Sequence, residues 1–154
     1  MVYNMKVYAV NKKAYYDYEI LETYEAGISL LGPEVKAIRN NRVSLNDAYC
    51  KIKNSEVFVI NMNITPINPN SFFERFDPLR ERKLLLKKNE IKRLIGKVKE
   101  KGLTLIPLKV YSKNRWIKLE IALVKGKTSY DKRQAIKKKE EQREIQRLLK
   151  LKNR

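Results

Sequence analysis

The chain has 154 residues, with 35 Lys and Arg against 17 Asp and Glu, and its formal net charge is +18. Apolar residues make up 43% of the sequence, so we expect a folded core rather than a disordered chain. The length predicts one domain of ordinary size. The large positive charge favours a polyanionic partner, and nucleic acid is a commoner one than an anionic membrane surface.

The residues that the sequence lacks narrow the function classes. It contains no His, the commonest general base and a common metal ligand, so we expect neither an enzyme nor a metal centre. Cys50 is the single cysteine, which rules out an intrachain disulfide and fits a reducing cytoplasm. No apolar run reaches about 18 residues, and the first residues lack a signal-peptide pattern, so we expect no membrane segment.

Residues 17–31 predict the first strand of the fold. Apolar residues from Ile20 to Leu30 recur at even spacing, which is the period of a half-buried strand. Gly27 indicates a bulge or the close approach of another backbone. Residues 32–41 then place Pro33 in the first turn of a short helix.

A hairpin is predicted next, because residues 47–53 and 57–64 are rich in β-forming side chains and a short polar turn joins them. Cys50 falls on the apolar side of the first of these strands, so we expect it in the core. Residues 66–78 contain three prolines and show no clear period. They predict a loop that exposes the phenylalanines Phe72, Phe73 and Phe76.

The clearest helix covers residues 89–102, where Asn89 supplies an N-cap and Gly102 ends an apolar stripe. Residues 103–111 and 115–124 alternate with period two around a short turn and predict a second hairpin. About six antiparallel strands with inserted helices indicate a mainly β fold. We expect a small closed antiparallel barrel of the oligonucleotide-binding type with flanking helices, and an open α+β sandwich is the alternative.

Two features point to a nucleic-acid surface. Residues 78–88 place cations on both sides of three leucines, which suits phosphate binding, although a solvated strand edge is the plainer interpretation. Glu25 is an acid in a basic protein. Its carboxylate suits hydrogen bonds from a base amino group or a ribose 2′-hydroxyl, although an exposed Glu on a strand needs no ligand.

The last segment, residues 126–154, holds eleven Lys and Arg against four Asp and Glu. Its apolar stripe is thin, so a helix here has too little burial to be stable alone. We therefore expect two parts. Residues 1–125 form a nucleic-acid-binding β-barrel domain, and residues 126–154 form a basic tail that is disordered when free and helical against a polyanion. A solubilising tail that never orders is the plainer alternative.

Five segments resemble the SsrA-binding protein family, also called small protein B, whose members bind transfer-messenger RNA in the rescue of stalled bacterial ribosomes. The segments are "NKKA" at 11–14, "ETYEAGISLLGPEVKAIR" at 22–39, "DPLRERKLLL" at 77–86, "KGLTLIPLKVY" at 101–111 and "ALVKGKTSYDKR" at 122–133. They occur in the family's order and at its spacings, so the resemblance covers nearly the whole chain.

This resemblance implies a barrel with one face that grips the tRNA-like domain of transfer-messenger RNA. It also implies that Glu25 contacts RNA rather than solvent alone. The positions that match RNA-contacting residues of the family, together with their basic neighbours, are Asn11, Lys12, Glu25, Lys36, Arg82, Lys83 and Leu85.

The resemblance gives the tail a role as well. In a stalled ribosome the tail is expected to enter the decoding centre and to fold as a helix in the empty mRNA channel. The matching residues are Gly126 as a hinge, and then Lys127, Tyr130, Asp131, Lys132 and Arg133. The chain departs from the family pattern at Pro33, Phe76, Thr128 and Glu141.

The leading hypothesis is a non-enzymatic RNA-binding factor of trans-translation that needs no cofactor and acts as a monomer in the cytoplasm. Its implied partners are transfer-messenger RNA, the small ribosomal subunit with its 16S rRNA, and the elongation factor that carries charged tRNA. One alternative is a general single-stranded nucleic-acid-binding barrel. Another is a metal-dependent nuclease, which the scattered Asp and Glu residues disfavour.

Overall fold

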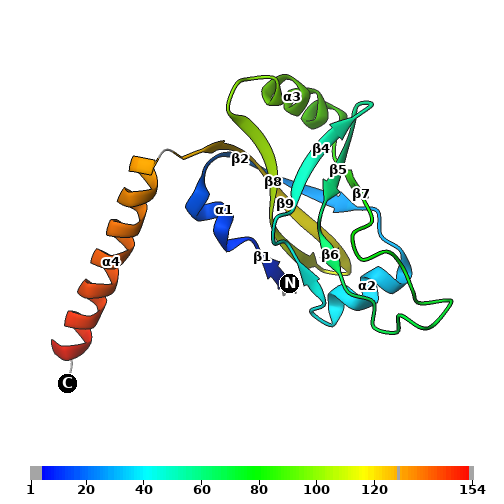
Figure 1. Cartoon of the computed structure of the whole chain (residues 1–154), viewed down its shortest axis with the longest axis horizontal. Coiled ribbons are helices and arrows are strands. Elements are labelled where there is room, and N and C mark those ends of the chain that lie inside the picture. The colour runs from blue at the N-terminus through cyan, green and yellow to red at the C-terminus, as the bar shows by residue number, and fades with distance from the viewer. Residues whose placement is uncertain (1–4, 128, 153–154) are drawn as a thin grey trace.

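The computed structural model describes residues 5–127 and 129–152, and Figure 1 shows the arrangement of their elements. In chain order the elements are β1 (Met5–Val10), α1 (Lys12–Asp17), β2 (Tyr18–Ile28), α2 (Gly32–Arg39), β3 (Val43–Ser44), β4 (Tyr49–Lys53), β5 (Glu56–Ile60), β6 (Asn63–Ile64), β7 (Arg82–Leu85), α3 (Lys88–Val98), β8 (Leu103–Lys113), β9 (Trp116–Gly126) and α4 (Ser129–Lys152).

The fold is mainly β and antiparallel, as the sequence predicts. Seven strands form one sheet in the order β1-β8-β9-β2-β7-β5-β4, and β3 pairs with β6 in a small second sheet. Both predicted hairpins are confirmed as β4–β5 and β8–β9. The two predicted helices are confirmed as α2 and α3, whereas α1 and β1 were not predicted.

The closed barrel expected from the sequence is not confirmed. The sheet ends at β1 and β4, and it curls so that β4 lies beside β8 (Figure 1), yet no ladder joins these two strands within the described residues. The residue after β1 explains part of this gap. Asn11 donates its backbone N–H to the Leu108 carbonyl at 2.7 Å and its side-chain amide to the Pro107 carbonyl at 3.0 Å. This part of β8 is therefore already paired.

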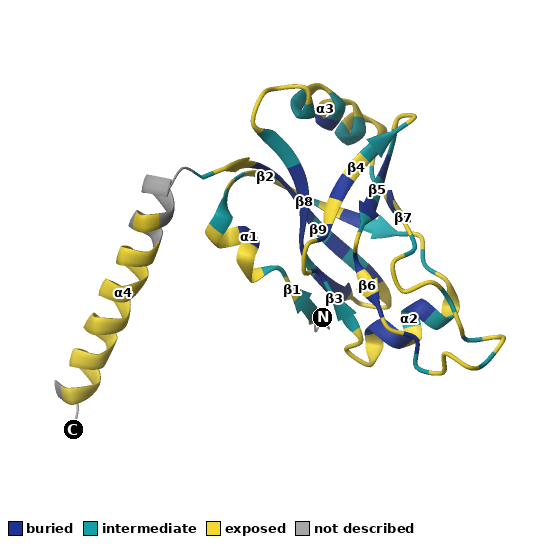
Figure 2. Cartoon of the chain, in the orientation of Figure 1, coloured by how far each residue is buried: buried dark blue, intermediate teal, exposed yellow. Residues whose placement is uncertain are grey.

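The main core lies on the inner face of the curled sheet (Figure 2). Strand β5 and the first half of β9 alternate buried apolar residues with half-buried or exposed ones, as a strand with one covered face does. Ile38 of α2 and Leu94 of α3 are fully buried against this face. Phe76 also packs against it, so the exposed position predicted for that ring is wrong, while Phe72 and Phe73 are exposed as predicted.

A second, smaller core lies on the outer face beneath α1. Ala14 of α1 packs there with Ile106, Leu108, Ala122 and Val124 of β8 and β9. This explains why residues 121–124 are buried without alternation, since both faces of the sheet are covered at that end. Beyond α1, β2 and the first half of β9 keep their alternation and present exposed or half-buried side chains on the outer face.

A buried ion cluster joins α2, β7 and the chain around β6. Glu34, in the first turn of α2, is fully buried, and its carboxylate contacts Arg82 Nε at 2.6 Å and Arg80 Nη2 at 2.5 Å. Arg82 is also fully buried and donates to the carbonyls of Met62 at 2.6 Å and Pro78 at 3.2 Å. The cluster fixes the position of β7, a strand of only four residues.

The Glu34 carboxylate is held in its ionised form. Burial raises the pKa of Glu34, but hydrogen bonds from Arg80, from the Leu31 N–H and from Arg82 outweigh burial and leave the pKa below its usual value. A buried carboxylate that is fully paired in this way tolerates its environment, whereas an unpaired one does not.

Removing the carboxylate should expose the dependence of the fold on this cluster. We expect Glu34→Gln to lower the free energy of unfolding by about 3–5 kcal/mol, because it leaves the buried Arg82 charge without its partner. Arg82→Met alone should also destabilise, and the double variant Glu34→Gln/Arg82→Met should lose less than the sum of the two. Urea unfolding measures all three. Additive losses, or a loss below about 1 kcal/mol for Glu34→Gln, would contradict this account.

Acid should weaken the ion pair between Arg93 and Glu22, which links α3 to β2. Hydrogen bonds from Arg93 and then from the Tyr24 hydroxyl lower the pKa of Glu22 from its usual 4.5 to about 2. A lowered carboxylate pKa contributes stability above the unfolded value of 4.5 and loses it as the pH falls toward 2. We expect Tm to fall over this range, and to fall less steeply in Glu22→Gln. Thermal melts with equal slopes for both proteins would rule out this contribution.

Candidate nucleic-acid interface

Strand register brings Glu25 and Leu85 onto one outward face of the sheet, although 60 positions separate them in the sequence. Gly27 of β2 pairs with Leu85 of β7, and Glu25 lies two residues before Gly27 on the same side of β2. A Cβ atom at Gly27 would lie 3.2 Å from the Leu85 Cβ, so only glycine lets the two strands approach this closely without adjustment. The predicted close approach at Gly27 is thereby confirmed.

A shallow groove follows this line of the outer face. It is lined by Glu25 and Gly27 of β2, Leu85, Leu86 and Lys87 after β7, Glu90 of α3 and Lys118 of β9. The groove therefore combines two carboxylates, an exposed leucine and two lysines. These groups suit hydrogen bonding to ribose or base edges, apolar contact and phosphate binding, in that order.

Glu25 is positioned by its neighbours on β8. The Tyr111 hydroxyl donates to Glu25 Oε2 at 2.6 Å, and Lys113 Nζ lies 3.8 Å from the same oxygen. Burial and then the bond to Glu25 raise the pKa of Tyr111, so its hydroxyl remains a donor at neutral pH. The Glu25 side chain still exposes 41% of its surface, which leaves it accessible to a ligand.

Lys83 and Lys36, two other predicted RNA-binding residues, are exposed but ion-paired. Lys83 lies on the same outward face as Leu85, two residues away, with its Nζ 3.2 Å from Glu56. Lys36 extends from α2 to Glu74 of the 66–81 loop, with an Nζ–Oε1 distance of 2.9 Å. The structure therefore places Lys83 near the groove, whereas Lys36 braces the loop and does not line the groove.

Arg82 requires a correction. Its side chain is fully buried and is used by Glu34 and two carbonyl groups, so it is not available for the direct RNA contact that the sequence predicted. Along β7 the side chains alternate, which puts Arg82 and Leu84 inside and Lys83 and Leu85 outside. We assign Arg82 to positioning that outer pair.

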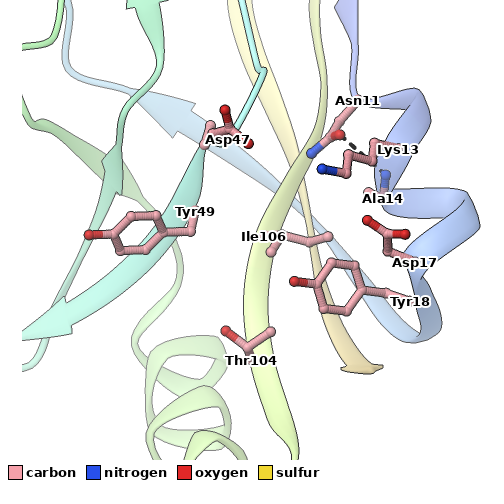
Figure 3. A pocket seen from close by; sticks show the side chains of 10 residues that line it. Asn11, Lys13, Ala14, Asp17, Tyr18, Asp47, Tyr49, Thr104 and Ile106 are labelled. Atoms are coloured by element: carbon pink, nitrogen blue, oxygen red, sulfur yellow. Dashed lines mark hydrogen bonds between the residues drawn. The ribbon is translucent and has the colours of Figure 1, made fainter. Parts of the chain in front are cut away.

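Asn11 and Lys12 lie away from the groove, at the start of α1. The Asn11 side chain caps α1 by accepting the Ala14 N–H at 3.2 Å while its amide donates to Pro107. Figure 3 shows it at the edge of a hollow between α1, β8 and the start of β4, where Tyr18 and Tyr49 also lie. Asn11 thus holds α1 on the sheet, and the exposed Lys12 is carried by that helix.

The tail leaves the sheet beside α1. Gly126 ends β9, and Lys127 donates its N–H to the Asp17 carbonyl at 3.0 Å and its Nζ to the Tyr15 carbonyl at 3.3 Å. Helix α4 then projects away from the sheet (Figure 1), and Arg133 on it is exposed. Thr128, and the side chains of Tyr130, Asp131 and Lys132, lie outside the described residues.

Sequence reasoning missed Lys118 and Glu90 of the groove lining, and Tyr111 beside it. Lys118 carried a usable signal, because Trp116, Lys118 and Glu120 are the polar or outward phase of an alternating strand. Tyr111 carried none, since its contact with Glu25 joins strands 86 positions apart. Within the described part of the chain there is no cluster of acidic or cysteine side chains suited to a metal ion, and none of the described helices is apolar and long enough to cross a bilayer.

The chain is similar to known proteins along nearly its whole length. The family model described as SmpB protein matches residues 8–151. An SsrA-binding protein of Gloeobacter violaceus is 55% identical over 94% of this chain and 94% of its own length. One of Thermosipho africanus is 58% identical over 95% of this chain and 98% of its own length.

A solved structure is similar as well. It is described as "tmRNA-SmpB: a journey to the center of the bacterial ribosome", and its matching chain has a TM-score of 0.66 and 43% identity. The match covers 82% of this chain and 92% of that one. The family model and these relatives show that the chain belongs to the SmpB protein family.

Proposed function

We propose that this protein binds the tRNA-like domain of transfer-messenger RNA and delivers it to stalled ribosomes in trans-translation. The family and the names of its members support this function. The structural observation that carries it is the groove on the outer face, where Glu25 and Leu85 meet although they are distant in the sequence. Both were singled out from the sequence as RNA-contacting positions.

The groove contains side chains that can contact the bases, the riboses and the phosphates of a folded RNA. The Glu25 carboxylate accepts hydrogen bonds from an exocyclic amino group or a 2′-hydroxyl, and Leu85 packs against a ribose or a base. Lys118 and Lys87 attract the adjacent phosphates, with Lys83 beside them. Recognition of this kind is binding and not catalysis, so we propose a non-enzymatic factor without a cofactor.

The remaining predicted residues act around the groove in this proposal. Arg82 holds β7 in place from inside, and Lys36 braces the 66–81 loop. Asn11 anchors α1, so that Lys12 is presented to the RNA from a fixed position. The curled sheet, with β4 beside β8, serves as an incompletely paired form of the oligonucleotide-binding barrel.

We propose that residues 126–154 have a function separate from that of the RNA-binding groove. The apolar side chains described on α4 are all exposed, namely Ile136, Ile145, Leu148, Leu149 and Leu151. A helix with so little burial gains most of its stability from a partner. In this proposal the tail orders fully in the decoding centre and the mRNA channel, where Lys127, Tyr130, Asp131, Lys132 and Arg133 contact 16S rRNA and Gly126 is the hinge.

The setting of this function follows from the same proposal. The partners are transfer-messenger RNA, the small ribosomal subunit and the elongation factor that carries charged tRNA. In this proposal the protein acts as a monomer in the cytoplasm.

Reversing the charge of Glu25 should reduce selectivity for the tRNA-like domain. We expect the wild-type protein to keep that labelled RNA against excess bulk tRNA and single-stranded RNA at physiological salt. Glu25→Lys should lose this preference because the acceptor is gone, although added charge strengthens non-specific binding. Glu100→Lys is the matched control, since Glu100 is an exposed Glu that follows α3 and lies outside the groove lining. Equal competition by all three RNAs would support the single-stranded-binding alternative instead.

Removing the tail should separate the two proposed activities. A chain that ends at Lys127 keeps the hydrogen bonds to Asp17 and Tyr15 and loses residues 128–154. We expect the Kd of this variant for the tRNA-like domain to lie within about twofold of the Kd of the full chain, because the groove is intact and distant from the deleted residues. It should fail to support peptide tagging in a stalled-ribosome translation assay. A large loss of RNA affinity, or normal tagging, would argue against separate roles.

A further inference from the structure

Trp116, the single tryptophan of the chain, is 71% exposed at the start of β9. A singly exposed apolar side chain is common on protein surfaces, so the position of the indole on the sheet, and not its exposure alone, indicates what it contacts. Strand alternation sets its direction. Ile117 and Leu119 belong to the core, so Trp116 points to the outer face.

Trp116 lies on the same outer face of the sheet as the Glu25 groove. Trp116, Lys118 and Glu120 alternate along β9, and β2 places Gly27 opposite Lys118 and Glu25 opposite Glu120. The four-residue step from Trp116 to Glu120 spans about 13 Å along a strand. A short segment of unpaired RNA crosses such a distance, so one RNA can reach both the groove and the indole.

Basic residues flank Trp116 in the strands and the turn where it lies. Lys113 is the cross-strand partner of Trp116, and its Nζ lies 3.8 Å from Glu25. Arg115 precedes Trp116, and its carbonyl accepts a hydrogen bond from Arg39 at 2.9 Å, which holds a further guanidinium at this turn. An apolar protein partner would have to desolvate these charges, whereas phosphates neutralise them while a base stacks on the ring.

We infer that Trp116 is a base-stacking residue for an unpaired base of the RNA that occupies the Glu25 groove. The inference rests on the proposed function, because the groove fixes where the RNA lies. It extends the interface from β2 and β7 across β9 to the turn between β8 and β9.

The single tryptophan permits a direct test. The full chain is titrated with the tRNA-like domain while Trp emission is recorded, and complex formation is followed in parallel by filter retention. We expect quenching along the same curve as retention, because a stacked base contacts the indole. Full retention with unchanged emission overturns this inference and leaves the proposed function intact. Absence of retention overturns both.

Variants test the contribution of the ring to affinity. Trp116→Ala should weaken binding about tenfold, and Trp116→Tyr should recover most of it because a flat ring is restored. Phe73→Ala is the matched control, since Phe73 is 86% exposed but lies in the 66–81 loop, and it should bind like wild type. Circular dichroism checks that each variant folds. Wild-type affinity for Trp116→Ala, or an equal loss in Phe73→Ala, contradicts the assignment.

Discussion

The shared carboxylate of Glu34 is the contact on which the outer groove depends. Strand β7 has four residues, and its two ladders are short: it pairs with β2 at Gly27 and Ile28 and with β5 at residues 57–59. Arg82 adds an anchor in the interior through Glu34 and the carbonyls of Met62 and Pro78. Because the side chains of a strand alternate, fixing Arg82 inside fixes Lys83 and Leu85 outside.

The inner face of the sheet holds the main core, and the outer face carries the residues of the proposed RNA-binding groove. The inner face is covered by α2 and α3 and holds the main core, while α1 covers only one end of the outer face. The uncovered remainder carries Glu25, Leu85 and Lys118 in the groove and Trp116 beyond it. In the proposed function, stability and RNA contact therefore depend on opposite side chains of the same strands.

The tail is attached at the other end of this arrangement. Lys127 is bonded to the carbonyls of Asp17 and Tyr15 at the end of α1, which sets the direction in which α4 leaves the sheet. None of the groove residues takes part in this attachment. An RNA held on the outer face and a tail that enters another partner are therefore compatible in one small protein.

Local sequence patterns predicted the elements that depend mainly on residues close together in the chain. Alternation identified the β8–β9 hairpin, the cap and stripe identified α3, and Gly27 marked the close approach of β7. Long-range contacts were not predictable in this way. The sequence does not distinguish the buried from the exposed cations of residues 78–88. Arg82 is buried because it pairs with Glu34, which lies 48 positions away. Helix α1 has six residues and no apolar stripe, and Asn11 bonds to a part of β8 that is 96 positions away in the sequence.

The most direct test of the central claim is a set of intermolecular NOEs between leucine methyl groups and the tRNA-like domain of transfer-messenger RNA. Leu85 is exposed in the groove, Leu84 is its buried neighbour, and Leu79 and Leu31 are exposed elsewhere. The account predicts NOEs from the Leu85 methyls to ribose or base protons, with none from Leu84, Leu79 or Leu31. A bound RNA that shows no NOE to Leu85, or equal NOEs to Leu79 and Leu31, would contradict the claim that this face reads the RNA.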